Sequence, residues 1–165
     1  MPQRYYFYMT SFLISSDIYR NTHYGGKHPL NIPRVGATLD LIKAMSWCDE
    51  AKFITAPIAK PSLLKKFHSN DYVNVLIEAD EKQEIDKNQS NKYNLGTPSN
   101  PIFKGMYKRP ATSVGGSVVA AEFAFLHGRA FNLGGGLHHG LANKANGFCY
   151  LLSLIHISEP TRHCL

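Results

Sequence analysis

The sequence predicts an α/β protein with a mainly parallel sheet, and three observations lead to this class. Short apolar stretches alternate along the chain with segments whose apolar residues recur at helical spacing, as in strand–helix–strand units. The length of 165 residues, 44% of them hydrophobic and 18% charged, suits one globular domain with its own core. A glycine-rich loop follows the last apolar stretch, and in parallel sheets ligands bind at the carboxyl ends of the strands.

The first half of the chain predicts two strands and three helices. Aromatic residues indicate a strand at residues 5–9, whereas glycines and prolines make residues 23–34 a loop. Apolar residues at helical spacing predict a helix at residues 35–46, and a short strand follows at residues 53–55. A short helix is expected at residues 61–67, with proline in its first turn. Ser69 is the expected N-cap of a helix at residues 71–78.

The second half predicts one long helix and one strand. Residues 80–94 are polar and rich in lysine, which indicates a surface excursion, and residues 97–101 form a loop with two prolines. Pro110 opens a helix that reaches about Leu126, and its small residues would allow it to lie close on a sheet. Residues 130–133 form the strand that leads into the glycine-rich loop.

Charge and cysteine content exclude several function classes. The formal net charge is +6, but lysine and arginine are scattered without a basic block, so no direct binding to nucleic acid is expected. The three cysteines form no disulfide framework and no CxxC pair, which favours a reducing, cytoplasmic setting. The N-terminus lacks the features of a secretory signal, and no apolar run is long enough to span a membrane. Nothing in the sequence indicates an oligomeric state.

The segment FNLGGGLHHG at residues 131–140 carries the strongest functional signal. His138 and His139 can accept and donate protons near neutral pH. A dinucleotide-binding loop is disfavoured, because G-x-G-x-x-G counted from Gly134 would require glycine in place of His139, and no Gly-Lys-Ser/Thr is present. The histidines remain either ordinary loop residues or a functional pair. Neighbouring residues on an extended chain point apart, so a general acid/base role suits them better than joint ligation of one metal ion.

Four segments resemble, in order, those of the histone deacetylase superfamily, which includes acetoin-utilisation deacetylase-like proteins and acetylpolyamine amidohydrolases. GGGLHHGLANKANGFCY at residues 134–150 is similar to the active-site loop of that family. YGGKHPLNIPR at 24–34 resembles its N-terminal segment, LKKFHSNDYV at 64–73 a helix junction, and residues 93–106 the loop before its long helix. The resemblance covers about residues 5–151. It implies a three-layer α/β/α, arginase/deacetylase-like arrangement and hydrolysis of an N-acetyl amide by a zinc-bound water.

The resemblance also implies roles for particular residues. His138 and His139 would be the catalytic acid/base pair. Gly147 would line the substrate tunnel with its backbone, and Phe148 would form one apolar wall. Arg34 matches the arginine near the acetate exit. The implied substrate is an acetylated amine, of the acetyl-lysine or acetylpolyamine type.

Two departures from the family pattern bear on function. Many members hold the substrate backbone with an acidic residue, and here Ser99 is the nearest candidate, so a non-histone or small-molecule substrate stays open. The zinc ligands of the family, an Asp-x-His pair and a later Asp, and its transition-state tyrosine lie beyond the GFCY segment, and this chain offers none of them. No metal ligand is therefore assigned, and zinc is expected only in a full-length parent.

The last residues differ in character from the rest. Residues 152–165 are expected to be a non-native tail, because their back-translation resembles a transposon-type sequencing adapter read in frame; a divergent natural C-terminus is the alternative. Residues 1–151 would then be the N-terminal part of a truncated deacetylase domain, which we expect to be inactive and poorly soluble. The alternative to an enzyme is a non-catalytic, deacetylase-like module that binds acylated amines.

Overall fold

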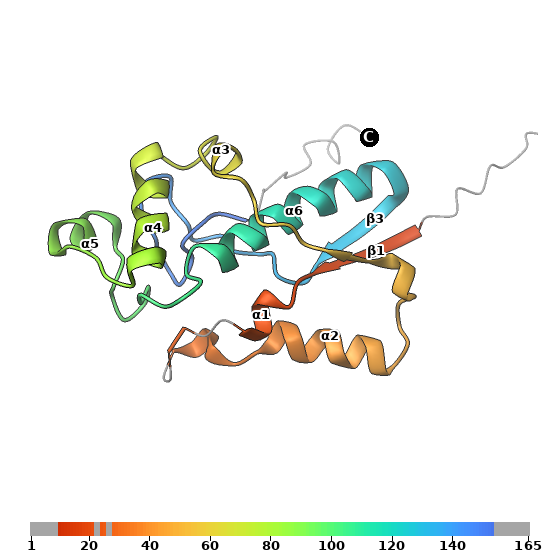
Figure 1. Cartoon of the computed structure of the whole chain (residues 1–165). Helices are drawn as coiled ribbons and strands as arrows, with labels where there is room; N and C mark the ends of the chain where they lie inside the picture. The colour runs from red at the N-terminus through yellow and green to blue at the C-terminus, as the bar shows by residue number, and fades with distance from the viewer. Residues whose placement is uncertain (1–9, 22–23, 26–27, 154–165) are drawn as a thin grey trace, which may run out of the picture.

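The computed structural model, which describes residues 10–21, 24–25 and 28–153, is built on a three-stranded parallel sheet (Figure 1). The strands are β1 (Thr10–Ser15), β2 (Phe53–Thr55) and β3 (Gly128–Asn132), in the spatial order β2-β1-β3. β1 is central and pairs in parallel with both neighbours, so Leu13 lies between Phe53 and Phe131. The predicted α/β class with a parallel sheet is confirmed.

Helices lie on both sides of this sheet and beyond its end. The described helices are α1 (Ile18–Asn21), α2 (Arg34–Ala44), α3 (Pro61–Leu64), α4 (Asn70–Lys82), α5 (Lys87–Tyr93) and α6 (Lys108–His127), with 3-10 turns at Pro29–Asn31 and Glu50–Lys52. Figure 1 shows α6 and α2 on opposite sides of the strands, which gives the three layers. None of the described helices is long and apolar enough to cross a membrane.

Small residues in α6 explain how closely this helix approaches the sheet. A Cβ atom at Gly115 would lie 2.0 Å from the carbonyl oxygen of Pro57, just after β2. A Cβ atom at Gly116 would lie 2.8 Å from the side-chain oxygen of Asn132 at the end of β3. Both positions are buried, so a larger residue at either one would force the helix away from the strands. The expected close approach is confirmed.

The main core lies around α4 and the last described segment. Tyr72, Leu76, Met106 and Tyr150 are fully buried there. The hydroxyl of Tyr72 donates to the carbonyl of Tyr150 over 2.6 Å, and the Tyr150 hydroxyl donates to the carbonyl of Pro101 over 2.5 Å. Burial raises the pKa of both phenols, so each stays a neutral donor. These bonds attach residues 146–153 to α4 and to the loop before α6.

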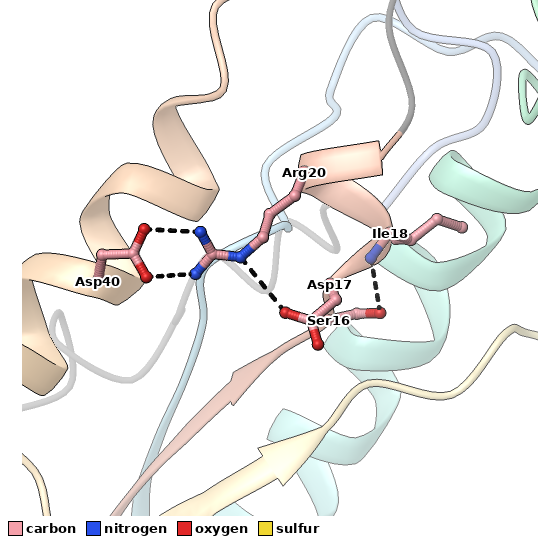
Figure 2. A network of polar contacts seen from close by, with 5 residues as sticks. All are labelled: Ser16, Asp17, Ile18, Arg20 and Asp40. Carbon is pink, nitrogen blue, oxygen red and sulfur yellow. Dashed lines mark hydrogen bonds and ion pairs between the residues drawn. The ribbon is translucent and has the colours of Figure 1, made fainter.

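An ion-pair network fixes α2 against the turn after β1 (Figure 2). The guanidinium of Arg20 donates to both carboxylate oxygens of Asp40 over 2.6 Å, and its Nε donates to Asp17 over 3.4 Å. The stem of Arg20 packs over Gly36, where a Cβ atom would lie 2.9 Å from the Arg20 Cγ. The bond from Arg20 lowers the pKa of the Asp40 carboxyl. The pair is exposed, so its main effect is to orient α2 relative to the turn after β1.

The structure adds two helices that were not expected. Residues 80–94 are largely exposed, as predicted for a surface excursion, but α4 continues to Lys82 and α5 fills residues 87–93. The Asp86 side chain caps α5 by accepting from two backbone N–H groups, and Tyr93 anchors it in the core. The short helix α1 was not expected. The predicted strand at residues 5–9 lies outside the described residues, and β1 begins at Thr10.

The other expected elements are found with small shifts. The helix expected at residues 35–46 spans Arg34–Ala44, the strand at residues 53–55 is confirmed, and the long helix starts at Lys108. The helix expected at residues 61–67 ends at Leu64. Ser69 caps α4 as predicted, its hydroxyl accepting from the N–H of Tyr72.

Candidate active site

The glycine-rich loop begins where β3 ends. The side-chain oxygen of Asn132 accepts from the N–H of Gly134 over 3.1 Å, and its amide nitrogen donates to the Ser113 carbonyl and the Ser117 hydroxyl on α6. A Cβ atom at Gly134 would lie 2.1 Å from the ring of Tyr19, so only glycine fits there. Asn132 thus fixes the first residue of the loop to both the sheet and the long helix.

The far side of the loop is held by the last described residue. The N–H of Leu137 donates to the Ser153 hydroxyl and the N–H of Ser153 donates to the Leu137 carbonyl, both over 2.9 Å. The hydroxyl of Ser117 donates to the Ser153 carbonyl over 2.7 Å. Leu152 and Ser153 belong to the expected non-native tail. The rest of that tail, residues 154–165, lies outside the described residues.

The buried His68 side chain connects Leu141, just after the histidine loop, to Leu152, near the end of the described residues. The N–H of Leu152 donates to Nε2 of His68 over 3.0 Å, so Nδ1 of His68 carries the proton and donates to the Leu141 carbonyl over 3.0 Å. Burial lowers the pKa of His68, because the charged imidazolium would be poorly solvated there. This neutral ring holds the histidine loop closed at its base.

His138 and His139 lie side by side on the solvent side of the loop. Their ring centroids are 4.0 Å apart, with 44° between the ring planes. Nδ1 of His138 lies 2.9 Å from the carbonyl oxygen of Gly136. A carbonyl can only accept, so this nitrogen carries a proton and leaves the Nε2 lone pair available as a base. The expectation that the two side chains point apart is wrong, because the chain turns at Gly136, where φ is +87°, instead of continuing as a strand.

The Gly147–Phe148 pair forms a tight turn against these rings. The backbone of Asn146 exchanges two hydrogen bonds with that of Cys149, and φ is +51° at Gly147 and +68° at Phe148, as a type I′ turn requires. A Cβ atom at Gly147 would lie 2.9 Å from Cγ of His139. A positive φ costs a bulky residue such as Phe148 about 1–2 kcal/mol. The turn thus brings the Gly147 backbone onto His139. The next residue, Phe148, has a half-buried ring.

The remaining predicted residues lie at different distances from this centre. The Phe148 ring packs edge-on against His28 with centroids 4.7 Å apart, and Nε2 of His28 lies 3.3 Å from the Ser99 carbonyl oxygen. Ser99 and Phe148 therefore contact the same imidazole, that of His28. Arg34 is exposed and its guanidinium donates to the Pro29 carbonyl over 3.2 Å. Arg34 is not among the residues that line the cavity behind the glycine loop.

A cavity of about 150 Å³ lies behind the glycine loop. Its lining includes Tyr19, Tyr24, Arg109, Gly134 and Leu137. The Arg109 guanidinium carbon lies 5.3 Å from the Tyr19 ring centre and 5.1 Å from that of Tyr24, and one of its terminal nitrogens is buried without a hydrogen-bond partner among the described residues. Burial raises the pKa of Tyr24 to about 12 although the positive charge of Arg109 opposes the shift. The cavity is thus suited to a small anion.

Three of these residues were not singled out from the sequence. His28 stood inside a recognised segment, and its position before proline could have marked it as a cap. His68 stood inside another such segment, but only the fold shows that it is buried. Arg109 carries no local signal, because its importance comes from a cavity whose walls are distant in sequence.

Comparisons with known proteins identify one family. Residues 28–157 match the family described as Histone deacetylase domain. The acetoin utilization protein AcuC of Bacillus subtilis is 35% identical over 143 residues, covering 84% of this chain and 36% of the relative. Histone deacetylase HDAC1 of Drosophila melanogaster is 34% identical over 141 residues, covering 82% of this chain and 26% of the relative.

Solved structures lead to the same family. The crystal structure of an HDAC homolog from Aquifex aeolicus superposes with a TM-score of 0.83 at 39% identity, covering 87% of this chain and 39% of that one. A structure of an HDAC homolog complexed with SAHA matches equally well. This chain therefore spans well under half the length of the relatives that it matches.

Proposed function

The chain belongs to the histone deacetylase family, and from that premise we propose that it supplies the proton-transfer half of a zinc-dependent hydrolase acting on acetylated amines. The observation that carries this proposal is the pair of adjacent, solvent-facing imidazoles of His138 and His139. One of them has its Nδ1 proton committed to a backbone carbonyl, which leaves a base directed away from the loop. Amide hydrolysis needs such groups to deprotonate water and protonate the leaving amine.

The two imidazoles are close enough to act on one bound group. Their ring centroids are 4.0 Å apart, and both side chains are exposed on the same loop. We therefore assign His138 and His139 to alternate as base and acid in one reaction cycle.

The surroundings of the pair support an acylated amine as substrate. Phe148 offers an apolar wall for a methylene chain, and the Gly147 backbone packs on His139, so an extended side chain could run along the Phe148 ring toward the imidazoles. Ser99 provides no carboxylate for a peptide backbone, which favours small acetylated amines over protein substrates. The cavity beside Arg109 has the size and charge to hold the released carboxylate.

The metal does not fit the described residues alone. Among residues 10–21, 24–25 and 28–153, no group of three or more His, Cys, Asp or Glu side chains converges on one point. A zinc site requires about three or four such ligands. We propose that zinc in a full-length protein is held by residues outside this chain, and that the chain alone neither binds zinc stoichiometrically nor turns over.

Two preparations test this proposal together. The first is the purified 165-residue chain, in which metal analysis after dialysis against zinc and an acetyl-lysine peptide assay should both be negative. The second is a chimera of residues 1–151 with the C-terminal remainder of the Aquifex aeolicus HDAC homolog, which should hydrolyse the peptide. In the chimera, His138→Ala or His139→Ala should lower the rate by about 10²–10⁴-fold. His127→Ala, at the end of α6, is the matched control and should have no effect.

The outcomes separate the candidate functions. Zinc binding or hydrolysis by the 165-residue chain itself would contradict the assignment of the metal to residues elsewhere. A folded, zinc-loaded chimera that binds N-acetyl-lysine but does not hydrolyse it would favour the non-catalytic binding module. The genomic coding sequence tests the tail separately: a native frame that encodes residues 152–165 would refute the adapter origin.

A further inference from the structure

His28 is connected to more parts of the site rim than any residue assigned so far. Its imidazole reaches the backbone of Leu30 and of Ser99 and contacts the rings of Tyr24 and Phe148. These partners come from three segments that are far apart in sequence. The side chain itself is only half-buried, so its contacts are made at the surface of the site and not in the core.

The hydrogen bonds of His28 select one form of the ring. The N–H of Leu30 donates to Nδ1 over 3.1 Å, so Nδ1 bears a lone pair. Nε2 must then carry the proton, which it donates to the Ser99 carbonyl over 3.3 Å. Neither bond is possible in the opposite tautomer. A protonated Nδ1 would meet the N–H of Leu30, two donors, and an unprotonated Nε2 would meet the carbonyl oxygen of Ser99, two acceptors.

The ring faces of His28 are used as fully as its nitrogens. One face stacks on the buried Tyr24, with centroids 4.7 Å apart and 14° between the planes. Phe148 meets the ring edge-on, at 4.7 Å and 83°. Phe148 sits at a strained positive φ, so the local backbone alone does not favour its position. Among the described residues, the aromatic contact of the Phe148 ring is with His28, and this contact holds the Phe148 ring in place.

We propose that His28 is a positioning residue that, in its Nε2–H tautomer, sets the entrance of the acyl-amine site by fixing the Phe148 ring and the Ser99 backbone relative to each other. Its role rests on the proposed function, in which Phe148 is the substrate wall. His28 itself makes no contact with His138 or His139 in any described interaction, so it acts through Phe148 and not on the reacting atoms.

The first test needs no substitution. In the 165-residue chain labelled with ¹⁵N-histidine, two-bond ¹H–¹⁵N correlations at pH 7.5 report which ring nitrogen is protonated. The expected result for His28 is a protonated Nε2 and an unprotonated Nδ1. A protonated Nδ1 would overturn the proposal.

Two variants then separate positioning from simple packing. His28→Phe keeps the ring stack but loses both hydrogen bonds, so amide exchange at Leu30 should accelerate at least tenfold and the Phe148 ring signals should shift. His28→Asn keeps an acceptor for the Leu30 N–H, so exchange there should stay within about twofold, while the Phe148 signals still shift. His127→Phe, on the outer end of α6, is the matched control and should change neither. Unchanged Leu30 exchange and Phe148 signals in His28→Phe would refute the role.

A titration distinguishes this inference from the proposed function. N-acetyl-lysine methylamide added to the wild-type chain should shift the Phe148 signals, and His28→Phe should weaken its apparent Kd by about tenfold. If the amide binds nowhere while the tautomer and the variant effects hold, the positioning role of His28 stands and the substrate assignment fails. If the amide binds equally well to wild type and His28→Phe, the positioning role fails.

Discussion

The first and third of the consecutive glycines of the loop, Gly134 and Gly136, are required for different reasons, and two substitutions separate them. Gly134→Ala places a methyl group 2.1 Å from the ring of Tyr19, which is buried and bonded to the Ser113 hydroxyl over 3.3 Å. Gly136→Ala meets nothing within 4 Å, but φ there is +87°. The first change therefore creates a steric conflict, and the second creates only backbone strain.

The two costs can be worked out from the same structure. At Gly134, overpacking costs about 1–3 kcal/mol and displacement of Tyr19 loses a hydrogen bond worth about 1 kcal/mol. At Gly136, the left-handed backbone costs about 1–2 kcal/mol. Each is offset by about 0.4–1 kcal/mol, because alanine restricts the unfolded chain. We expect net losses of about 2–3 kcal/mol for Gly134→Ala and about 1 kcal/mol for Gly136→Ala.

Urea unfolding followed by circular dichroism measures both, and a second background makes the test specific. With a slope of about 2 kcal/mol per M, Gly134→Ala should lower the urea midpoint by about 1 M. In a Tyr19→Leu background the ring is gone, so the cost of Gly134→Ala should fall by at least about 1 kcal/mol, while that of Gly136→Ala should be unchanged. Equal costs of Gly134→Ala in both backgrounds would show that the contact with Tyr19 does not explain this glycine.

Three further predictions concern stability and solubility. Burial lowers the folded-state pKa of His68, so the contribution of this residue to the free energy of unfolding is complete above about pH 6.5. The contribution declines, by at most about 1.4 kcal/mol per pH unit, as the pH falls toward the lowered pKa. His68→Gln should flatten this pH dependence in urea titrations between pH 7.5 and 5. Asn100 is fully buried, and neither Nδ2 nor Oδ1 of its side chain has a hydrogen-bond partner among the described residues. Asn100→Leu should therefore raise the free energy of unfolding by about 1–3 kcal/mol, and a decrease would show that the side-chain amide is not left unpaired. Phe125 is 91% exposed, so Phe125→Glu should increase the soluble fraction after expression, whereas an equal fraction would place the cause of aggregation elsewhere.

The elements that the sequence predicted well are those with strong local signals. Residues 53–55 and the start of α6 carry clear apolar or proline signals, and the Ser69 cap follows from a side chain that acts on its own backbone. The helix α5 was missed because a polar, lysine-rich composition hides its two determinants, the Asp86 cap and the buried ring of Tyr93. Composition describes the exposed face of such a helix, whereas a single anchor decides whether it packs.

The site was predictable where it is contiguous in the chain and not where it is assembled by the fold. His138, His139 and Gly147 lie in one loop and one turn, so the motif alone singled them out, although it did not predict the close approach of the two imidazoles. Arg34 was assigned from its matching position, but its side chain is exposed and bonded to Pro29. The role of Arg34 therefore stays a prediction. The half-buried guanidinium behind the loop is that of Arg109, whose relation to the loop depends on where α6 crosses the sheet.

The Gly147–Phe148 turn lies between His139 and His28. The contacts that it makes with these two rings explain why Gly147 and Phe148 both take a left-handed conformation. Gly147 lies against His139, and any side chain there would push the imidazole away. Phe148, the next residue, points its ring to His28 on the other side of the turn. A type I turn, with negative φ at both positions, would direct these groups differently and separate His139 from the Phe148 ring. The strain at Phe148 is therefore the cost of packing two successive residues, Gly147 and Phe148, against His139 and His28.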